Sequence, residues 1–170
     1  MSDDMLRVMR RMRAIKDYTP EPIDEQTIQQ ILEVGRWTGT GGNRQPTEVL
    51  VVRDADVRRN FGEWGAKPAA AAPLVLLLVT AQDQFAFDEG RVAERLCLAA
   101  AACDLGATVA TLKEEGPDRA KELLGIPRDR RARTIVAIGH KPADAGFAPT
   151  AMTSKAGRKP MSEFAHWDRF

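Results

Sequence analysis

The spacing of apolar residues predicts two amphipathic helices in the first part of the chain. Between residues 5 and 15 apolar side chains recur every three or four positions, which is the repeat of one helix face. Asp24 suits the N-cap of a second helix, with Ile23 and Ile28 placed as a hydrophobic staple across that cap. We expect this second helix to end near Trp37.

Apolar runs further along the chain predict a buried sheet. Residues 74–80 are apolar without alternation, which is typical of a strand covered on both faces. Shorter runs at 49–52, 107–111 and 134–138 predict three more strands. A helix is expected over 118–124, so strands and helices alternate in this part of the chain.

A long helix is expected from Asp88 or Glu89 to about Leu105, with Gly106 as its C-terminal cap. Residues 96–103 within it are apolar on every side. A helix that is apolar all round is buried all round. In a small chain this pattern indicates packing against both the chain's own sheet and a second subunit.

Composition limits the classes of function. The length of 170 residues is that of a single domain. The chain has 25 basic and 24 acidic side chains, which give a net charge of +1. This balance provides no bulk field for nucleic acid or an anionic membrane, so any anion-binding site must be local. The apolar runs are far shorter than a membrane span and no signal peptide is evident, so we expect a cytoplasmic protein.

Neither cysteines nor histidines form a recognisable reactive group. Cys97 and Cys103 should face different sides of one helix, which argues against a disulfide and favours small buried apolar residues. His140 and His166 lack metal-ligand spacing and a nucleophile partner, and we interpret both as structural. We therefore expect no metal site, and the chemistry must come from a bound cofactor.

A polar, glycine-rich loop at 38–46 separates the second helix from the first strand. Its glycines match neither the phosphate loop of nucleotide-binding proteins nor the dinucleotide pattern, because a strand follows them instead of a helix. A nucleotide-binding fold therefore loses support.

Three segments together resemble the spaced signatures of the nitroreductase family. They are Arg-Ala-Ile-Lys-Asp-Tyr at 13–18, Gly-Gly-Asn-Arg-Gln-Pro at 41–46 and Arg-Lys-Pro at 158–160. The resemblance spans nearly the whole chain. It implies an α+β fold, a three-layer α/β/α sandwich with a mainly antiparallel sheet, formed by a single FMN-binding domain over 1–170. It also implies an intertwined homodimer with two FMN sites.

The first motif implies contacts to the cofactor from Arg13, Ala14 and Lys16. Arg13 would bind the FMN phosphate, for which a guanidinium is well suited, and Lys16 would lie near flavin N1 and O2. The alternative is that these are solvated charges at a helix end, where they favour the helix dipole. The family's usual Arg and Ser are replaced by Met12 and Ala14, which removes a cation and a hydroxyl and should weaken FMN binding.

The loop motif implies that Thr40, Gly41, Asn43 and Gln45 cover the flavin of the opposite subunit. Asn43 has an alternative interpretation as a turn residue that satisfies its own backbone.

A third group follows the strand at 107–111, where the family presents backbone N–H groups to flavin N5 and O4. Here Lys113 and Glu114 replace the common glycines, which puts the turn geometry in question. Lys67 lies where some members have another polar flavin contact, although a surface lysine explains it equally well.

The basic pair Arg158 and Lys159 matches the family's late contact to the FMN phosphate. The tail at 141–170 would be an arm docked on the partner subunit, to which the aromatic Trp167 and Phe170 are suited. A tail held only by its aromatic residues is the alternative.

The resemblance implies an FMN-dependent enzyme that passes hydride from NADH or NADPH to a small acceptor, such as a nitroaromatic or a quinone, by a ping-pong cycle. No acid–base residue is needed for the first half of that cycle, and the absence of a long insertion suggests an open site. Two alternatives stay open: an FMN-dependent dehydrogenase or oxidase of a specific metabolite, and a flavin-binding protein without turnover.

Overall fold

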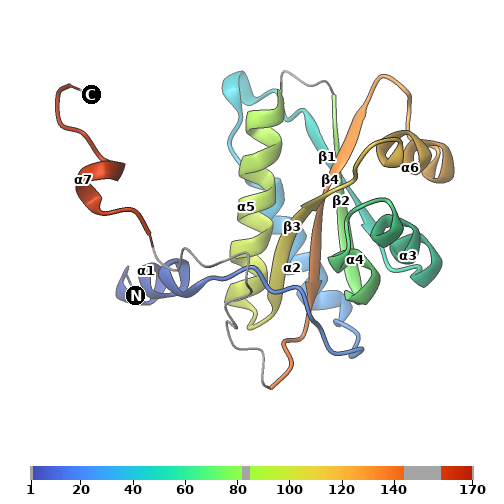
Figure 1. The fold of residues 1–170 in the computed structure, drawn as a ribbon, viewed down its shortest axis with the longest axis horizontal. Coiled ribbons are helices and arrows are strands. Elements are labelled where there is room, and N and C mark those ends of the chain that lie inside the picture. The colour runs from blue at the N-terminus through green and yellow to red at the C-terminus, as the bar shows by residue number, and fades with distance from the viewer. Residues whose placement is uncertain (1, 82–84, 144–157, 170) are drawn as a thin grey trace.

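The computed structural model describes residues 2–81, 85–143 and 158–169, with the side chains of 2–4 excepted (Figure 1). The helices are α1 (Ser2–Arg11), α2 (Glu25–Arg36), α3 (Ala55–Glu63), α4 (Pro68–Ala71), α5 (Ala86–Ala102), α6 (Gly116–Leu124) and α7 (Met161–Phe164), and a 3-10 turn, η1, covers Gly41–Asn43. The strands are β1 (Thr47–Val52), β2 (Leu74–Thr80), β3 (Gly106–Thr111) and β4 (Arg131–Gly139). They form an antiparallel sheet in the order β1-β2-β4-β3.

Helices cover both faces of this sheet. On β2, Leu74 and Leu76 pack in one core cluster with α2 and α5, whereas Val75 and Leu77 pack in a second cluster with α3, α4 and α6 (Figure 1). Every residue of β2 is buried, as the apolar run at 74–80 predicts. The expected α+β architecture with an antiparallel sheet between helical layers is therefore confirmed.

Local signals place several element ends correctly. The Asp24 side chain accepts a hydrogen bond from the Thr27 backbone N–H and caps α2, which ends at the C-cap Trp37. Helix α6 stops at Gly125, whose left-handed φ of 67° suits glycine. The four predicted strands are all present, with ends shifted by at most a few residues.

The prediction of a helix reaching residue 15 is wrong. Helix α1 ends at Arg11, and the chain then runs extended alongside β3. Ala14 forms a parallel bridge with Ala107, and the Ile15 backbone N–H donates to the Ala107 carbonyl at 3.0 Å. Hydrogen bonding to the free edge of β3 therefore replaces the last helical turn.

Gly106 is not the cap of the long helix. Helix α5 ends at the C-cap Cys103, and Asp104 takes the left-handed conformation with φ 58°. Gly106 instead begins β3, at a point where an added Cβ would lie only 2.7 Å from Ile15 Cγ2. This glycine is needed because the N-terminal segment crosses close to it. Helices α3 and α4 had no counterpart in the sequence prediction.

Burial along α5 agrees only in part with the expected burial on every side. Leu96, Cys97 and Ala100 are buried, whereas Leu98 and Ala102 retain exposure within the single chain. The remaining exposed stripe is where the sequence predicts a second subunit.

The C-terminal arm reaches away from the sheet. Figure 1 shows α7 standing apart from the helical layers. Its apolar side chains Met161, Phe164 and Trp167 are 72%, 76% and 88% exposed. Phe170 and the connection at 144–157 lie outside the described residues. Docking of this arm on a partner stays a prediction.

Within the described ranges, no helix has the length and apolar character needed to cross a bilayer.

A buried ion pair joins α5 to the start of β4. Arg131 Nε donates to Glu89 Oε2 at 3.0 Å, and the Glu89 side chain is only 3% exposed. We expect Glu89→Ala to lower the free energy of unfolding by about 1.5–3 kcal/mol, because it removes a charged hydrogen bond from a buried pair. Urea unfolding followed by circular dichroism measures this loss.

The matched control is Asp56→Ala, which breaks the exposed pair between Asp56 and Arg59. Exposed pairs contribute little, so the urea midpoint of this variant should stay close to that of the wild type. Equal losses in both variants would contradict a special role for the buried pair.

Candidate functional site

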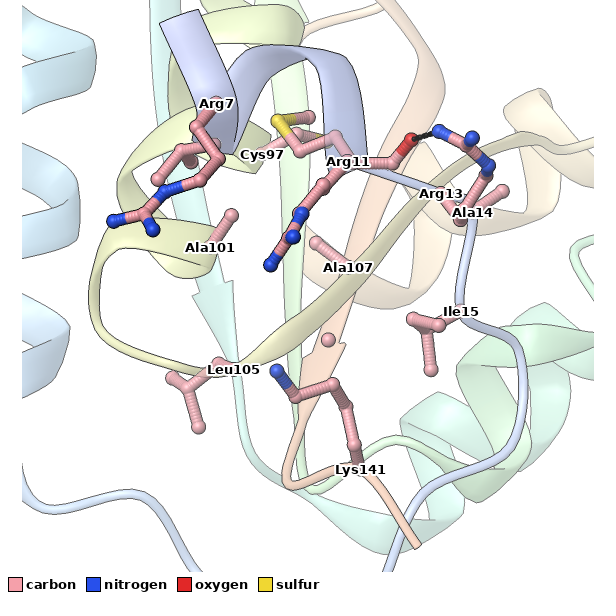
Figure 2. Close-up of a pocket in the computed structure, with 13 residues that line it drawn as sticks. Arg7, Arg11, Arg13, Ala14, Ile15, Cys97, Ala101, Leu105, Ala107 and Lys141 are labelled. Atoms are coloured by element: carbon pink, nitrogen blue, oxygen red, sulfur yellow. Dashed lines mark hydrogen bonds between the residues drawn. The ribbon is translucent and has the colours of Figure 1, made fainter. Parts of the chain in front are cut away.

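A cavity of about 580 Å³ lies where α1 and residues 12–15 cross the C-terminal end of α5 and the start of β3 (Figure 2). Lys141, two residues beyond β4, closes one side of it. The volume falls in the range of small-molecule and cofactor sites. Arg13 and Ala14 of the first motif line this cavity.

The backbone beside the cavity is fixed to the sheet. The Tyr18 hydroxyl donates to the Ile15 carbonyl and lies 3.0 Å from the Ala137 carbonyl of β4. Burial, followed by the nearby Cys97 and Asp17, raises the pKa of Tyr18, so its hydroxyl stays protonated. The motif segment is therefore held in one conformation from Ala14 to Tyr18.

The lining of the cavity is basic and apolar. Four of its residues are cations, Arg7, Arg11, Arg13 and Lys141, and none is an acid. The others are apolar, among them Met12 and residues of α5 and β3. Such a lining suits a ligand that carries both an anionic group and an apolar body.

The cations that face the cavity are not the ones the motif predicts. In Figure 2 the end groups of Arg11 and Lys141 point toward one another across the cavity, whereas Arg13 points away. The Arg13 guanidinium donates to the carbonyls of Arg10 at 2.9 Å and Met12 at 2.7 Å. Arg11, one residue before Met12, instead directs its guanidinium into the cavity.

Sequence reasoning missed Arg7, Arg11 and Lys141. Arg7 and Arg11 are four residues apart, which places them on one face of α1, and this spacing was the available signal. Lys141 has no local signal, because only the sheet brings the end of β4 beside α1. Its ammonium lies 2.7 Å from the Asp104 carboxylate and holds the pKa of that carboxyl below its usual range.

Cys97 also lines the cavity but is not a reactive thiolate. Burial, with a smaller effect from Glu94, raises the pKa of its thiol to about 12. Both cysteines are free, with Cys97 buried and Cys103 half-buried, as expected of small apolar residues. No metal-binding group of His, Cys, Asp or Glu occurs among the described residues.

The predicted loop residues form a compact turn of their own. The Gln45 backbone N–H donates to Thr40 Oγ1 at 2.9 Å, and the Gln45 carboxamide donates to Asn43 Oδ1 at 3.1 Å. Gly42, Asn43 and Gln45 have φ values of 59°, 53° and 47°. Asn43 is therefore a turn residue. Gly41 exposes its backbone to solvent, and Gln45 exposes its side chain.

None of the predicted loop residues lines the cavity of its own chain. The Arg91 guanidinium donates to the Gly39 carbonyl and ties the loop to the first half of α5. Ala101, near the other end of α5, lines the cavity. Cys97 lines it too, six residues after Arg91, which is about 9 Å along the axis. The two predicted halves of the site are not brought together within one chain.

The turn after β3 has a left-handed residue, a conformation that favours glycine, although no glycine is present at Lys113 or Glu114. Glu114 adopts the left-handed conformation with φ 51°. The Lys113 backbone N–H already donates to the Trp64 carbonyl at 2.8 Å, so a flavin contact through that group would have to displace this bond. The Lys113 side chain packs over Gly65, where an added Cβ would lie 2.8 Å from Lys113 Cγ.

The remaining candidates lie outside the cavity lining. Lys16 is exposed just beyond the bridge to β3, and Lys67 is exposed at the start of α4. Arg158 and Lys159 are exposed in the arm before α7. Their roles in cofactor binding stay predictions.

Comparison with known proteins finds relatives of similar sequence. Residues 9–86 match the sequence profile described as the nitroreductase family. A protein from Archaeoglobus fulgidus, provisionally named an NADH dehydrogenase/NAD(P)H nitroreductase, is 26% identical over 85% of this chain and 90% of its own length. A Thermus thermophilus protein named NADH dehydrogenase is 24% identical over 81% of this chain and 86% of its own.

Solved structures share the fold over nearly the whole chain. An FMN-dependent nitroreductase from Clostridium difficile R20291 superimposes with a TM-score of 0.81 at 18% identity, covering 96% of this chain and 98% of that one. The chain is therefore similar to nitroreductase-family proteins in sequence over residues 9–86, and it shares their fold over nearly its whole length.

The left-handed Glu114 offers a test of the turn. A residue with a Cβ pays about 1 kcal/mol or more in this region, so we expect Glu114→Gly to raise the free energy of unfolding by about 1 kcal/mol. Glu115 has φ −78° and serves as the control, because Glu115→Gly relieves no strain and should not stabilise. Thermal unfolding compares the two variants, and stabilisation by both or neither would contradict the assigned strain.

Proposed function

We propose that the protein is an FMN-dependent oxidoreductase that passes hydride from NADH or NADPH to a small acceptor. The observation that carries this proposal is the acid-free cavity beside the family's first motif, in which several cations meet an apolar floor. The Clostridium relative of the same fold is FMN-dependent, and the names of sequence relatives include NAD(P)H nitroreductase.

The residues of the cavity fit the cofactor's phosphate end. Arg11 and Lys141 face each other across the space and suit a phosphate dianion, with Arg7 beside them (Figure 2). Arg158 and Lys159 would reach the same phosphate from the arm. Bound FMN would supply hydride acceptance and donation at its N5 atom.

The chain's own residues would bind and orient. Lys16 places a cation next to the motif strand, where it would stabilise negative charge on the reduced flavin ring. The turn at Lys113 and Glu114 would face the N5 edge, with the Glu114 backbone as its donor. Tyr18 fixes the strand that carries Lys16. The lack of a thiolate, together with the protonated Tyr18, fits a site that uses electrostatics instead of acid–base catalysis.

A homodimer would complete the site. The loop residues Thr40, Gly41, Asn43 and Gln45 do not line the cavity of their own chain, so they would cover the cavity of a second copy. The exposed apolar side chains of the arm would bury themselves on that copy. A ping-pong cycle follows from a single open site, in which the nicotinamide leaves before a nitroaromatic or quinone enters.

Flavin reduction tests this function. The purified protein loaded with FMN is mixed anaerobically with NADH or NADPH while the flavin absorbance is followed. We expect bleaching, and recovery of the absorbance when a quinone or nitroaromatic is added. Bound flavin that stays oxidised with both donors would instead support a metabolite dehydrogenase or a flavin-binding protein without turnover. Failure to bind FMN would overturn the proposal.

Substitutions on the cavity side and on the loop side test the two halves of the site separately. Arg11→Gln and Arg158→Ala should each weaken FMN binding by about 1.5–3 kcal/mol if they remove a charged hydrogen bond to phosphate. The double substitution Asn43→Ala/Gln45→Ala should also weaken FMN binding, because it removes the contacts proposed for the loop. Arg53→Gln, in the remote exposed pair with Glu25, is the control and should leave FMN affinity unchanged.

Co-expression of differently tagged Arg11→Gln and loop-variant chains then tests the dimer. If each cavity is covered by the partner's loop, the heterodimer contains one fully intact site and binds one FMN with wild-type affinity. If each chain forms its own site, every site in the heterodimer keeps a defect. Binding no tighter than in the parent variants would therefore contradict the shared site.

A further inference from the structure

A second basin, of about 460 Å³, lies between α6 and the start of β4, away from the cavity described above. Its charged lining residues are Lys121, Arg128, Asp129, Arg130, Arg131 and Arg133. Pro117 and Ala132 are its only apolar lining residues. In a protein of net charge +1 this is a strong local concentration of positive charge, with little apolar surface to attract an uncharged ligand.

Three of the cations are fixed by acids outside the basin. Lys121 pairs with Asp118 at 2.9 Å, and it also lies 3.3 Å from the Arg128 carbonyl, which ties the loop to α6. Arg130 pairs with Glu48 at 3.1 Å, and Arg131 pairs with the buried Glu89 at 3.0 Å. The wall of the basin is therefore preorganised by the fold.

Two cations remain for a ligand. Among the residues that the structure describes, the side chains of Arg128 and Arg133 have no ion pair, and both are exposed at the basin. Asp129 is the one acid in the lining and offsets part of this charge. Two guanidinium groups beside a fixed cationic wall suit a phosphate monoester, which accepts paired hydrogen bonds from arginine.

The basin adjoins the turn that follows β3. The Arg133 carbonyl accepts a hydrogen bond from the Leu112 N–H at 2.8 Å, and Leu112 directly precedes Lys113. Pro117, in the first turn of α6, follows the same turn and lines the basin. From there the basin extends toward Lys121, about 6 Å further along the helix. A phosphate bound in the basin would thus lie beside α6, further along the chain than the turn at Lys113 and Glu114. We assign that turn to the flavin's reactive edge.

We propose that this basin binds the 2′-phosphate of NADPH and gives the enzyme a preference for NADPH over NADH, with Arg128 and Arg133 as the specificity-determining residues. The inference rests on the proposed function for the identity of the donor. The existence of the basin does not depend on that function, because it follows from the positions and charges of residues on α6 and β4.

Calorimetric binding to the FMN-loaded protein tests the basin without turnover. The probes are 2′,5′-ADP, which carries the 2′-phosphate, and 5′-AMP, which lacks it. We expect 2′,5′-ADP to bind at least tenfold more tightly, and the variant Arg128→Gln/Arg133→Gln to lose this difference. Arg119→Gln is the control, because Arg119 pairs with Glu115 and does not line the basin. The control should keep the wild-type discrimination.

In these binding experiments, two results with the wild type would overturn the inference. One is equal binding of the two nucleotides by the wild type. The other is displacement of 2′,5′-ADP by inorganic phosphate at similar concentrations, which would mark a general anion site instead of a nucleotide site. A double variant that keeps its discrimination while remaining folded, as judged by an unchanged melting temperature, would also exclude these two arginines.

Anaerobic flavin reduction provides the second measurement. We expect NADPH to exceed NADH in the second-order rate constant for reduction in the wild type, and the double variant to lower that ratio about tenfold with NADH reduction unchanged. Equal rates with both donors would overturn the inference and leave the proposed function intact. Reduction by neither donor would overturn the proposed function, while the nucleotide binding data would still report on the basin.

Discussion

The pairing of residues 14 and 15 with the edge of β3 determines where the candidate site lies. Ala14 bridges Ala107, and the Ile15 N–H donates to the same strand. This pairing ends α1 at Arg11 and carries the helix across the end of α5. Without it Arg11 would have no fixed position relative to Lys141. Gly106 allows the crossing because no Cβ occupies the space that Ile15 fills.

Charge in this chain is organised locally. The net charge is +1, yet the cavity at α1 has no acid in its lining and the basin at α6 has one. Both are surrounded by cations that come from separate elements. Acids such as Asp104, Asp118 and Glu89 sit outside and hold cations in place. A nearly neutral composition is therefore compatible with two surfaces lined by cations, because the pairing acids lie outside the two linings.

Much of the fold follows from local signals. The apolar run of β2 predicts a strand buried on both faces, and Asp24 and Gly125 mark helix ends through capping chemistry. Arg13 and Ala14 of the first motif line the cavity, while their contact with a cofactor stays a prediction. The motif pattern could not show that Arg13 turns back to its own carbonyls, because that orientation depends on where α1 ends.

The sequence by itself determined the strands, most of the helices and the resemblance to one family, since these depend on residue periodicity, caps and motifs close together in the chain. Only the tertiary structure decided which cations share a space. Lys141 meets Arg11 because β4 ends beside α1, whereas the loop at 38–46 is tied to Arg91 in the first half of α5. Contacts between distant segments depend on strand order and packing, which no local pattern encodes.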